Sequence, residues 1–262
     1  MNTQPIGIFD SGVGGTSIWK AIHALLPFEN TIYLADSKNA PYGQKTKEEI
    51  IDLCIKNTDL LLSKGCKLVV VACNTATTNA ISYLRNNYDI PFIGIEPAIK
   101  PAALNSGSGR VGILATKGTL SSSLFLKTSK DHASEITIVE QEGLGLVPLI
   151  EAGEINADET RQLLIKYLEP MLSANVDHIV LGCTHYPYLI PVLRELLPPG
   201  VKVIDCGAAV ARQTKVVLED NQMQNFSNTP GKIEFYTNKD TRILTSFLED
   251  VDQLKQIEYL NF

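Results

Sequence analysis

Short apolar runs and longer amphipathic stretches alternate along this chain. Each apolar run is bounded by polar or turn-forming residues, which is typical of a strand buried in a parallel sheet. The longer stretches predict helices: one ends near residue 26, the clearest covers 47–63, and the last covers 242–249. Because strands and helices alternate, the pattern predicts an α/β fold with right-handed crossovers. The expected strands are residues 6–9, 31–35, 68–72, 92–95, 110–116, 178–182, 201–204 and 232–237.

One strand-end arrangement occurs twice. The apolar run 68–72 ends at Cys73, and the run 178–182 ends at Cys183, each followed by small polar residues. A strand with a similar pattern begins each half of the chain. The arrangement predicts two equivalent cysteines, each placed where a strand gives way to a helix.

We therefore expect an α/β fold of two pseudo-symmetric parallel-sheet domains that face a central cleft. The first domain comprises residues 1–97 plus 213–262 and carries Cys73, and the second comprises residues 98–212 and carries Cys183. An α/β protein without internal symmetry also repeats strands at such intervals, so that alternative stays open. Because open α/β sheets bind ligands at the carboxyl ends of their strands, the two cysteines are expected on either side of one ligand.

Composition and charge narrow the class of protein. Hydrophobic residues make up 44% of the 262 residues and charged residues 20%, as in ordinary globular proteins. The net charge of −6 disfavours nucleic acid or an anionic membrane as a partner. The polar start is followed by an apolar stretch that stops at Asp10, too short for a signal sequence or a spanning helix. We therefore expect a cytoplasmic protein.

The cysteines suggest proton chemistry rather than disulfide bonds. The chain has five of them, an odd number, and none forms a C-x-x-C pair, which favours reduced thiols. A thiol has an ordinary pKa of about 8.5, and a helix N-terminus lowers it. Thiols at Cys73 and Cys183 could remove a proton from one face of a carbon and return one to the other. The alternative is that both are small buried apolar residues.

Polar residues near these strand ends are further candidates. The loop Asp10–Gly15 could bring backbone donors close to an anion, but it lacks the dinucleotide and phosphate-loop patterns. Asp10 either caps a turn or handles a proton beside a thiol. His185 could relay protons to Cys183, or it could be a structural histidine; too few ligands lie near it to predict a metal site. Glu151, by its residue context alone, is an ordinary surface acid at the start of a helix or loop.

Four motifs of the chain belong together: Ile8–Gly15, Ala40–Gly43, Ala72–Thr77 and Leu181–Pro187. In combination they resemble bacterial glutamate racemases of the aspartate/glutamate racemase superfamily. The resemblance covers residues 6–212, and the His-Tyr-Pro sequence after Thr184 favours the glutamate branch over the aspartate branch.

The resemblance implies a cofactor-independent enzyme that interconverts L- and D-glutamate and supplies D-glutamate for peptidoglycan. It implies no metal, a small-molecule substrate and a homodimer. Cys73 would deprotonate the D-isomer and Cys183 the L-isomer, with Asp10, His185 and Glu151 as auxiliary acids or bases. The substrate-binding residues that it implies are Asp10, Ser11, Pro41, Tyr42, Gly43, Asn74, Thr75, Thr119, Thr184 and His185.

Three other functions stay open. The same two thiols could racemise aspartate or another amino acid. The chain could be a non-catalytic anion-binding module that uses the loop Asp10–Gly15. A redox dithiol protein is disfavoured, because each cysteine ends a strand of its own and neither belongs to a C-x-x-C motif.

Overall fold

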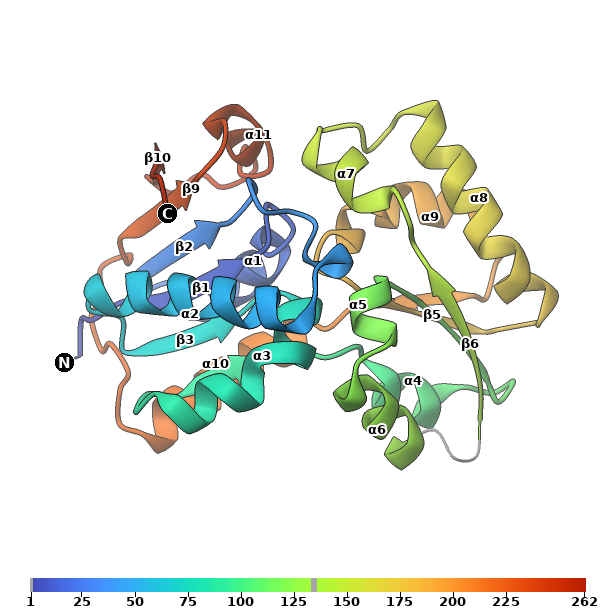
Figure 1. Ribbon diagram of the computed structural model, residues 1–262, viewed down its shortest axis with the longest axis horizontal. Helices are drawn as coiled ribbons and strands as arrows, with labels where there is room; N and C mark the ends of the chain where they lie inside the picture. The colour runs from blue at the N-terminus through green and yellow to red at the C-terminus, as the bar shows by residue number, and fades with distance from the viewer. Residues whose placement is uncertain (1, 133–135) are drawn as a thin grey trace.

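The computed structural model describes residues 2–132 and 136–262, which form two α/β units built on separate parallel sheets (Figure 1). The larger sheet has the strand order β10-β9-β2-β1-β3-β4 and the smaller one β6-β5-β7-β8. The larger sheet comprises β1 (Ile6–Asp10), β2 (Thr31–Ala35), β3 (Leu68–Val71), β4 (Phe92–Gly94), β9 (Ile233–Thr237) and β10 (Gln256–Tyr259). The smaller sheet comprises β5 (Arg110–Ala115), β6 (Thr137–Glu142), β7 (His178–Gly182) and β8 (Lys202–Ile204).

The strand order confirms the predicted pair of related α/β units. In the first unit the order β2-β1-β3-β4 contains the same succession as β6-β5-β7-β8 in the second. In this comparison β3 corresponds to β7, so the strands that precede the two motif cysteines hold equivalent places. The duplicated pattern read from the sequence is therefore a duplicated topology.

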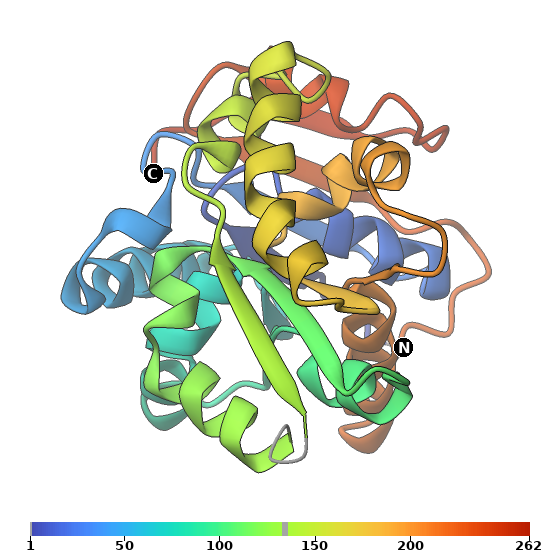
Figure 2. The same cartoon turned by 90° about the vertical axis from the view of Figure 1, so that its right-hand side faces the viewer.

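Helices cover both faces of each sheet. Figure 2 shows α8 on one side of the smaller sheet and α6 on the other. The first unit carries α1 (Thr16–Leu25), η1 (Tyr42–Gln44), α2 (Lys47–Ser63), α3 (Asn74–Asn87), α10 (Gly207–Asp220) and α11 (Thr241–Ser246). The second carries α4 (Ile99–Asn105), α5 (Lys117–Leu120), α6 (Ser123–His132), α7 (Leu146–Glu151), α8 (Asp158–Ser173), η2 (Tyr186–Leu189) and α9 (Ile190–Leu196).

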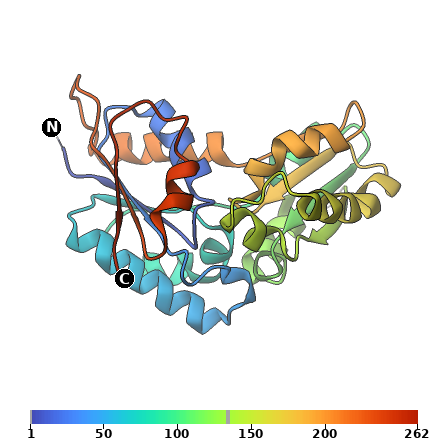
Figure 3. The ribbon, with the colours of Figure 1, turned by 90° about the horizontal axis from the view of Figure 1, so that it is seen from above.

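The chain returns to the first unit after β8. Helix α10 packs against α1, and β9, α11 and β10 follow on the same side of the molecule (Figure 3). The expected domain boundary between residues 212 and 213 falls inside α10. We therefore propose that the division into two domains lies just before this helix.

Local sequence signals explain the best-predicted helix, α2. Thr46 and Glu49 form a capping box: the Glu49 backbone N–H donates to the Thr46 hydroxyl at 3.2 Å, and the Thr46 N–H donates to the Glu49 carboxylate at 2.8 Å. The chain leaves the helix through Gly65, whose φ of +77° suits glycine. The predicted range 47–63 is confirmed.

Two strands and one helix start differ from the prediction. Strands β6 and β10 were not predicted, because they are largely half-buried or exposed and lack a continuous apolar run; the other two edge strands, β4 and β8, were predicted. Cys73 is the N-cap of α3, as expected, whereas Cys183 is followed by a turn and then by the 3₁₀ helix η2. Across the described ranges, no helix combines the length and apolar character needed to cross a membrane.

Candidate active site

A small pocket lies where the carboxyl ends of β1, β3, β5 and β7 come together between the two units. Its walls bring together most of the residues singled out in the sequence, including both motif cysteines. Asp10, Glu151 and Thr119 lie behind the walls. The lining residues are Ser11, Pro41, Tyr42, Gly43, Cys73, Asn74, Thr75, Thr116, Val147, Cys183, Thr184 and His185.

Cys73 is held at the start of α3 beside the loop that follows β1. Its thiol donates to the Ser11 hydroxyl at 3.6 Å, and its sulfur accepts the Ala76 backbone N–H at 3.5 Å. Burial raises the pKa of this thiol well above its ordinary value, and the charge of Asp10 raises it further. The expectation that the helix N-terminus lowers the Cys73 pKa is therefore wrong for this closed pocket: the helix donor acts in that direction, but burial outweighs it.

Asp10, the last residue of β1, is fully buried and organises the hydroxyl groups around it. Its carboxylate accepts the Gly15 N–H at 2.7 Å, the Ser11 hydroxyl at 3.3 Å and the Thr184 hydroxyl at 3.4 Å. Burial raises its pKa, while the charge of His185 and the Gly15 N–H act in the opposite direction. Asp10 thus connects Ser11, beside Cys73, to Thr184, beside Cys183.

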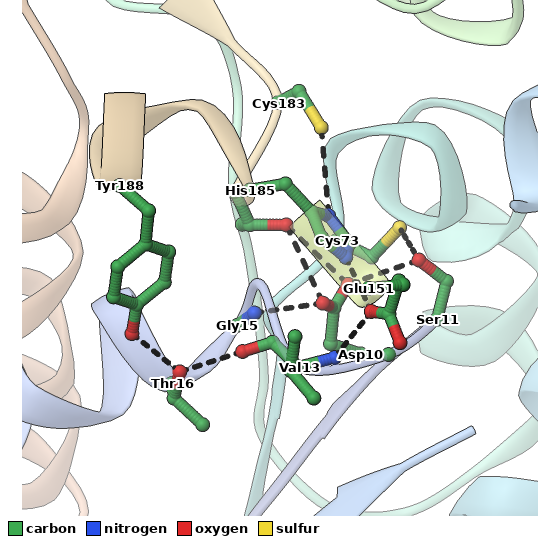
Figure 4. Close-up of polar contacts among 12 residues, drawn as sticks. Asp10, Ser11, Val13, Gly15, Thr16, Cys73, Glu151, Cys183, His185 and Tyr188 are labelled. Atoms are coloured by element: carbon green, nitrogen blue, oxygen red, sulfur yellow. Dashed lines mark hydrogen bonds and ion pairs between the residues drawn. The ribbon is translucent and has the colours of Figure 1, made fainter. Parts of the chain in front are cut away.

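Cys183, His185 and Glu151 form a linear relay on the other side of the pocket (Figure 4). Cys183 Sγ lies 3.7 Å from His185 Nδ1, and His185 Nε2 lies 2.6 Å from Glu151 Oε1. Burial by itself would lower the pKa of His185, but its hydrogen bonds to Cys183 and Glu151 raise it well above its ordinary value. Burial would raise the pKa of Glu151, but the contacts with His185 and Val13 bring it below its ordinary value.

These pKa directions describe an imidazolium between a carboxylate and a thiol. Both ring nitrogens of an imidazolium are donors, so His185 Nε2–H donates to Glu151 and Nδ1–H to Cys183. The two cysteines therefore differ in environment: Cys183 faces an imidazolium, whereas Cys73 faces hydroxyl and backbone donors and the charge of Asp10.

The loop after β1 accommodates this relay from the other unit. A Cβ on Gly12 would lie 1.9 Å from Glu151 Oε1, and a Cβ on Gly14 would lie 2.3 Å from His185 Nδ1. The Val13 backbone N–H donates to Glu151 Oε1 at 2.6 Å. The sequence predicts that this loop brings backbone donors close to an anion. In the structure that anion is the Glu151 carboxylate of the same chain. The residue-based expectation of a surface acid is wrong, because Glu151 is buried and ends α7.

Other polar groups of the walls lack partners or bond to one another. Asn74 is buried, and its side-chain oxygen and nitrogen have no hydrogen-bond partner within the part of the chain described. Thr75 and Thr116 hydroxyls lie 2.8 Å apart, and Thr119 lies behind them, 3.1 Å from Thr116. The unpartnered amide of Asn74 marks the place where a polar ligand would be recognised.

Tyr42 contributes to the wall while its hydroxyl points into the interior. That hydroxyl donates to the buried Asp36 carboxylate at 2.5 Å and accepts from Asn57 at 3.2 Å. Gly43, the next residue, packs so close to Thr116 that a Cβ there would lie 2.9 Å from the threonine Cβ. The segment Pro41–Gly43 is therefore fixed against both units.

Sequence reasoning missed Thr116 and Val147 as wall residues. Thr116 follows the end of β5 as Ser11 follows the end of β1, so the duplicated topology could have identified it. Val147 lies in α7 and carries no chemical signal. In the described ranges, no cluster of three or more histidine, cysteine, aspartate or glutamate side chains could hold a metal ion.

Comparison with known proteins agrees with this geometry. Residues 6–214 match the family model described as Asp/Glu/Hydantoin racemase. The glutamate racemase of Herpetosiphon aurantiacus is 46% identical over 240 residues, which cover 92% of this chain and 94% of that protein.

Solved structures show the same architecture. A glutamate racemase isoform from Bacillus anthracis matches with a TM-score of 0.89 at 26% identity, covering 99% of this chain and 98% of that one. The Escherichia coli glutamate racemase, solved with L-glutamate and the activator UDP-MurNAc-ala, matches with a TM-score of 0.85 at 34% identity, covering 98% of each chain. With two thiols in one pocket between duplicated α/β units, the chain belongs to the Asp/Glu/Hydantoin racemase family, and within it to the glutamate racemases.

Proposed function

We propose that this protein interconverts L- and D-glutamate, supplying D-glutamate for peptidoglycan, by proton transfer between two thiols and the α-carbon. The observation that carries the proposal is the placement of Cys73 and Cys183. They follow equivalent strands of two related units and line one pocket. The names of the relatives support glutamate as the substrate.

The reaction requires one thiolate and one thiol at a time. The thiolate takes the α-proton, so that an S–H bond forms as the Cα–H bond breaks. The opposed thiol then gives its proton to the other face of the carbon and becomes the thiolate. We assign Cys73 to deprotonation of the D-isomer and Cys183 to the L-isomer. No net redox change occurs, and each turnover leaves the two cysteines with exchanged protonation states.

The pocket walls support a carbanion-like transition state. The α-proton of an amino acid is weakly acidic, so charge developing beside the α-carboxylate needs fixed donors. Asn74 and the hydroxyls of Ser11 and Thr184 surround the two thiols and are suited to that role. The hydroxyls of Thr75 and Thr116 form a second polar cluster in the wall. This cluster is suited to bind the side-chain carboxylate of glutamate.

The charge arrangement gives Cys183 a ready proton partner. The His185 imidazolium donates to the sulfur when Cys183 is a thiolate, and Glu151 keeps the ring protonated and oriented. Cys73 instead lies beside the Asp10 carboxyl and the Ser11 hydroxyl, and burial raises the pKa of its thiol. The α-ammonium group of a bound amino acid would bring the positive charge that a Cys73 thiolate needs.

The test is the decay of the circular dichroism of L-glutamate with purified protein, without pyridoxal phosphate or added metal, and with L-aspartate in parallel. We expect decay with glutamate and none with aspartate. Cys73→Ser and Cys183→Ser should each abolish racemisation. Decay with aspartate alone would assign the chain to aspartate racemisation. No decay with either substrate, from folded protein with reduced thiols, would favour the anion-binding module.

We also propose a cytoplasmic homodimer. This proposal is supported by the family resemblance and by the expected reduced state of the thiols. Sedimentation velocity at micromolar concentration would contradict it by showing a single species of 28.7 kDa.

A further inference from the structure

Tyr188 connects the two units at a point just outside the pocket. It lies in η2, and Figure 4 shows its side chain directed toward Thr16 rather than toward the thiols. Its ring packs edge-on against Phe247, with centroids 4.5 Å apart at 86°. Lys20, which is paired with Asp250 at 2.6 Å, lies 5.6 Å from the ring centroid. Neither Tyr188 nor Thr16 lines the pocket.

The hydroxyl of Tyr188 acts as the donor in its bond to Thr16. The two hydroxyl oxygens are 2.5 Å apart, and the Thr16 hydroxyl donates to the Val13 carbonyl at 2.6 Å. A threonine hydroxyl has a single proton, and here it goes to Val13. The proton between the two hydroxyls therefore belongs to Tyr188, so loss of the phenol would leave Thr16 without its donor.

Val13 connects this contact to the relay through the two peptide units that flank its α-carbon. Its carbonyl is held by Thr16, and the N–H of Val13 donates to Glu151 Oε1 at 2.6 Å. The same oxygen lies 2.6 Å from His185 Nε2. The N–H of Tyr188 also donates to the His185 carbonyl at 3.2 Å. Tyr188 thus reaches both members of the pair, His185 through its backbone and Glu151 through Thr16 and Val13.

We propose that Tyr188 is a positioning residue that, through Thr16 and Val13, sets the geometry of the Glu151–His185 pair against Cys183. This inference rests on the proposed function of the relay in glutamate racemisation. A small displacement of a proton-transfer group slows the chemical step even when binding is intact. Because the Tyr188 hydroxyl does not touch the pocket, its loss should lower kcat and leave KM nearly unchanged.

The alternative is that Tyr188 only fastens the two units together. Tyr188→Phe separates these roles, since it keeps the ring against Phe247 and removes only the hydroxyl. Thr16→Val removes this contact together with the hydroxyl bond to the Val13 carbonyl, whereas Thr16→Ser keeps both. The matched control is Tyr88→Phe. Tyr88 is half-buried in the first unit, after α3, and its hydroxyl donates to Asp59 at 2.7 Å.

The experiment measures kcat and KM for glutamate racemisation, together with thermal unfolding, for these variants. Tyr188→Phe and Thr16→Val should each lower kcat by about tenfold, with KM changed less than about twofold. Thr16→Ser and Tyr88→Phe should keep the wild-type kcat. The double variant Tyr188→Phe, Thr16→Val should be no slower than Thr16→Val alone, because Thr16→Val already removes the contact that Tyr188→Phe removes.

Wild-type kcat in Tyr188→Phe and Thr16→Val would overturn the inference. So would an equal loss of kcat in Thr16→Ser, or a rise in KM with unchanged kcat. If Tyr188→Phe does not fold, Thr16→Val and Thr16→Ser carry the same test. An inactive wild-type protein would overturn the proposed function and this inference with it, whereas active wild-type protein with unaffected variants overturns the inference alone.

Discussion

At the scale of single residues, the glycines after β1 are fixed by nearby side chains, two of them by side chains from the other unit. Gly12 faces Glu151, Gly14 faces His185, and Gly15 would place a Cβ 2.6 Å from the Cβ of Asp10. None of these three glycines has a positive φ. Close approach, rather than backbone conformation, therefore excludes a larger residue. The loop therefore leaves room for the side chains of the relay. Adding a single methyl group at one of these glycines tests whether the relay needs that room.

Gly14→Ala should displace the His185 ring from Cys183. The added Cβ would lie 2.3 Å from Nδ1, closer than real contacts permit. We expect kcat for glutamate racemisation to fall by roughly 100-fold, since misplacing a proton-transfer group slows the chemical step by that order. The matched control is Gly107→Ala, where the nearest atom to the new Cβ is 3.7 Å away. Wild-type kcat in Gly14→Ala would show that His185 does not need this position.

Glu151→Gln should change both the rate and its dependence on pH. The amide can still accept the Val13 N–H, but it no longer carries the charge that helps to raise the pKa of His185. As pH rises through that raised pKa, the imidazolium and the activity that needs it are lost. In the variant the loss should begin at lower pH, and kcat at neutral pH should fall at least about tenfold.

The measurement is kcat against pH for the wild-type protein and for Glu151→Gln. Glu154→Gln, an exposed acid just beyond α7, is the control and should keep the wild-type profile. If kcat falls at the same alkaline pH in the wild-type protein and in Glu151→Gln, Glu151 does not set the protonation of His185.

At the scale of secondary-structure elements, the central strands of both sheets were predictable, whereas two of the four edge strands, β6 and β10, were not. Buried strands such as β3 and β7 form continuous apolar runs, and their positions follow from the sequence. Strand β6 is largely half-buried and is defined by its pairing with β5 rather than by an apolar run of its own. The same holds for the site. The two cysteines lie at the ends of predicted strands and could be located from the sequence, whereas the role of Glu151 depends on a tertiary contact that no local pattern encodes.

A buried ion pair connects elements of the first unit far from the pocket. Lys67, just before β3, lies 2.6 Å from Glu29, and both side chains are almost fully buried. The Lys67 ammonium also donates to the carbonyls of Asn2 and Met223, at 3.0 and 2.7 Å. The Lys67 ammonium therefore contacts three other segments of the chain: the N-terminus, the turn after α1 and the segment after α10.

Lys67→Met should destabilise the protein without slowing catalysis. The variant leaves the Glu29 carboxylate buried without its cation, which costs about 3–5 kcal/mol of unfolding free energy. The double variant Lys67→Met, Glu29→Leu should recover part of that loss, because no unpaired charge remains. Urea unfolding measures both, with kcat at 25 °C as the control for the site. A loss below about 1 kcal/mol in Lys67→Met would show that the carboxylate is rehydrated or protonated at little cost.

At the scale of the whole molecule, the reacting groups lie on two units, and we expect these units to separate for substrate to enter. Cys73 belongs to the first unit and Cys183 to the second, and the pocket between them is nearly closed. The Ser17 hydroxyl donates to the Thr184 carbonyl at 2.9 Å, and Val13 donates to Glu151 from across the same interface. These contacts assemble the relay when the units are together.

This arrangement predicts which buried cysteines react with a small alkylating reagent. The exposed fractions do not distinguish them: Cys73 is 5% exposed, Cys183 7% and Cys66 5%. Their locations differ, because Cys73 and Cys183 line the gap between units, whereas Cys66 lies in the core of the first unit, where burial raises its pKa to about 12. Partial separation of the two units would expose Cys73 and Cys183 to water and leave Cys66 buried.

We therefore expect iodoacetamide to modify Cys73 and Cys183 at least about tenfold faster than Cys66, as local opening costs less than global unfolding. Saturating D- or L-glutamate should slow modification of the first two and leave Cys66 unchanged. Peptide mass spectrometry over a time course separates the sites, and Cys54, which is fully buried in the same core, is a second internal control. Equal rates at all four sites, insensitive to glutamate, would mean that access comes from unfolding of the whole chain and that the units do not move as separate bodies.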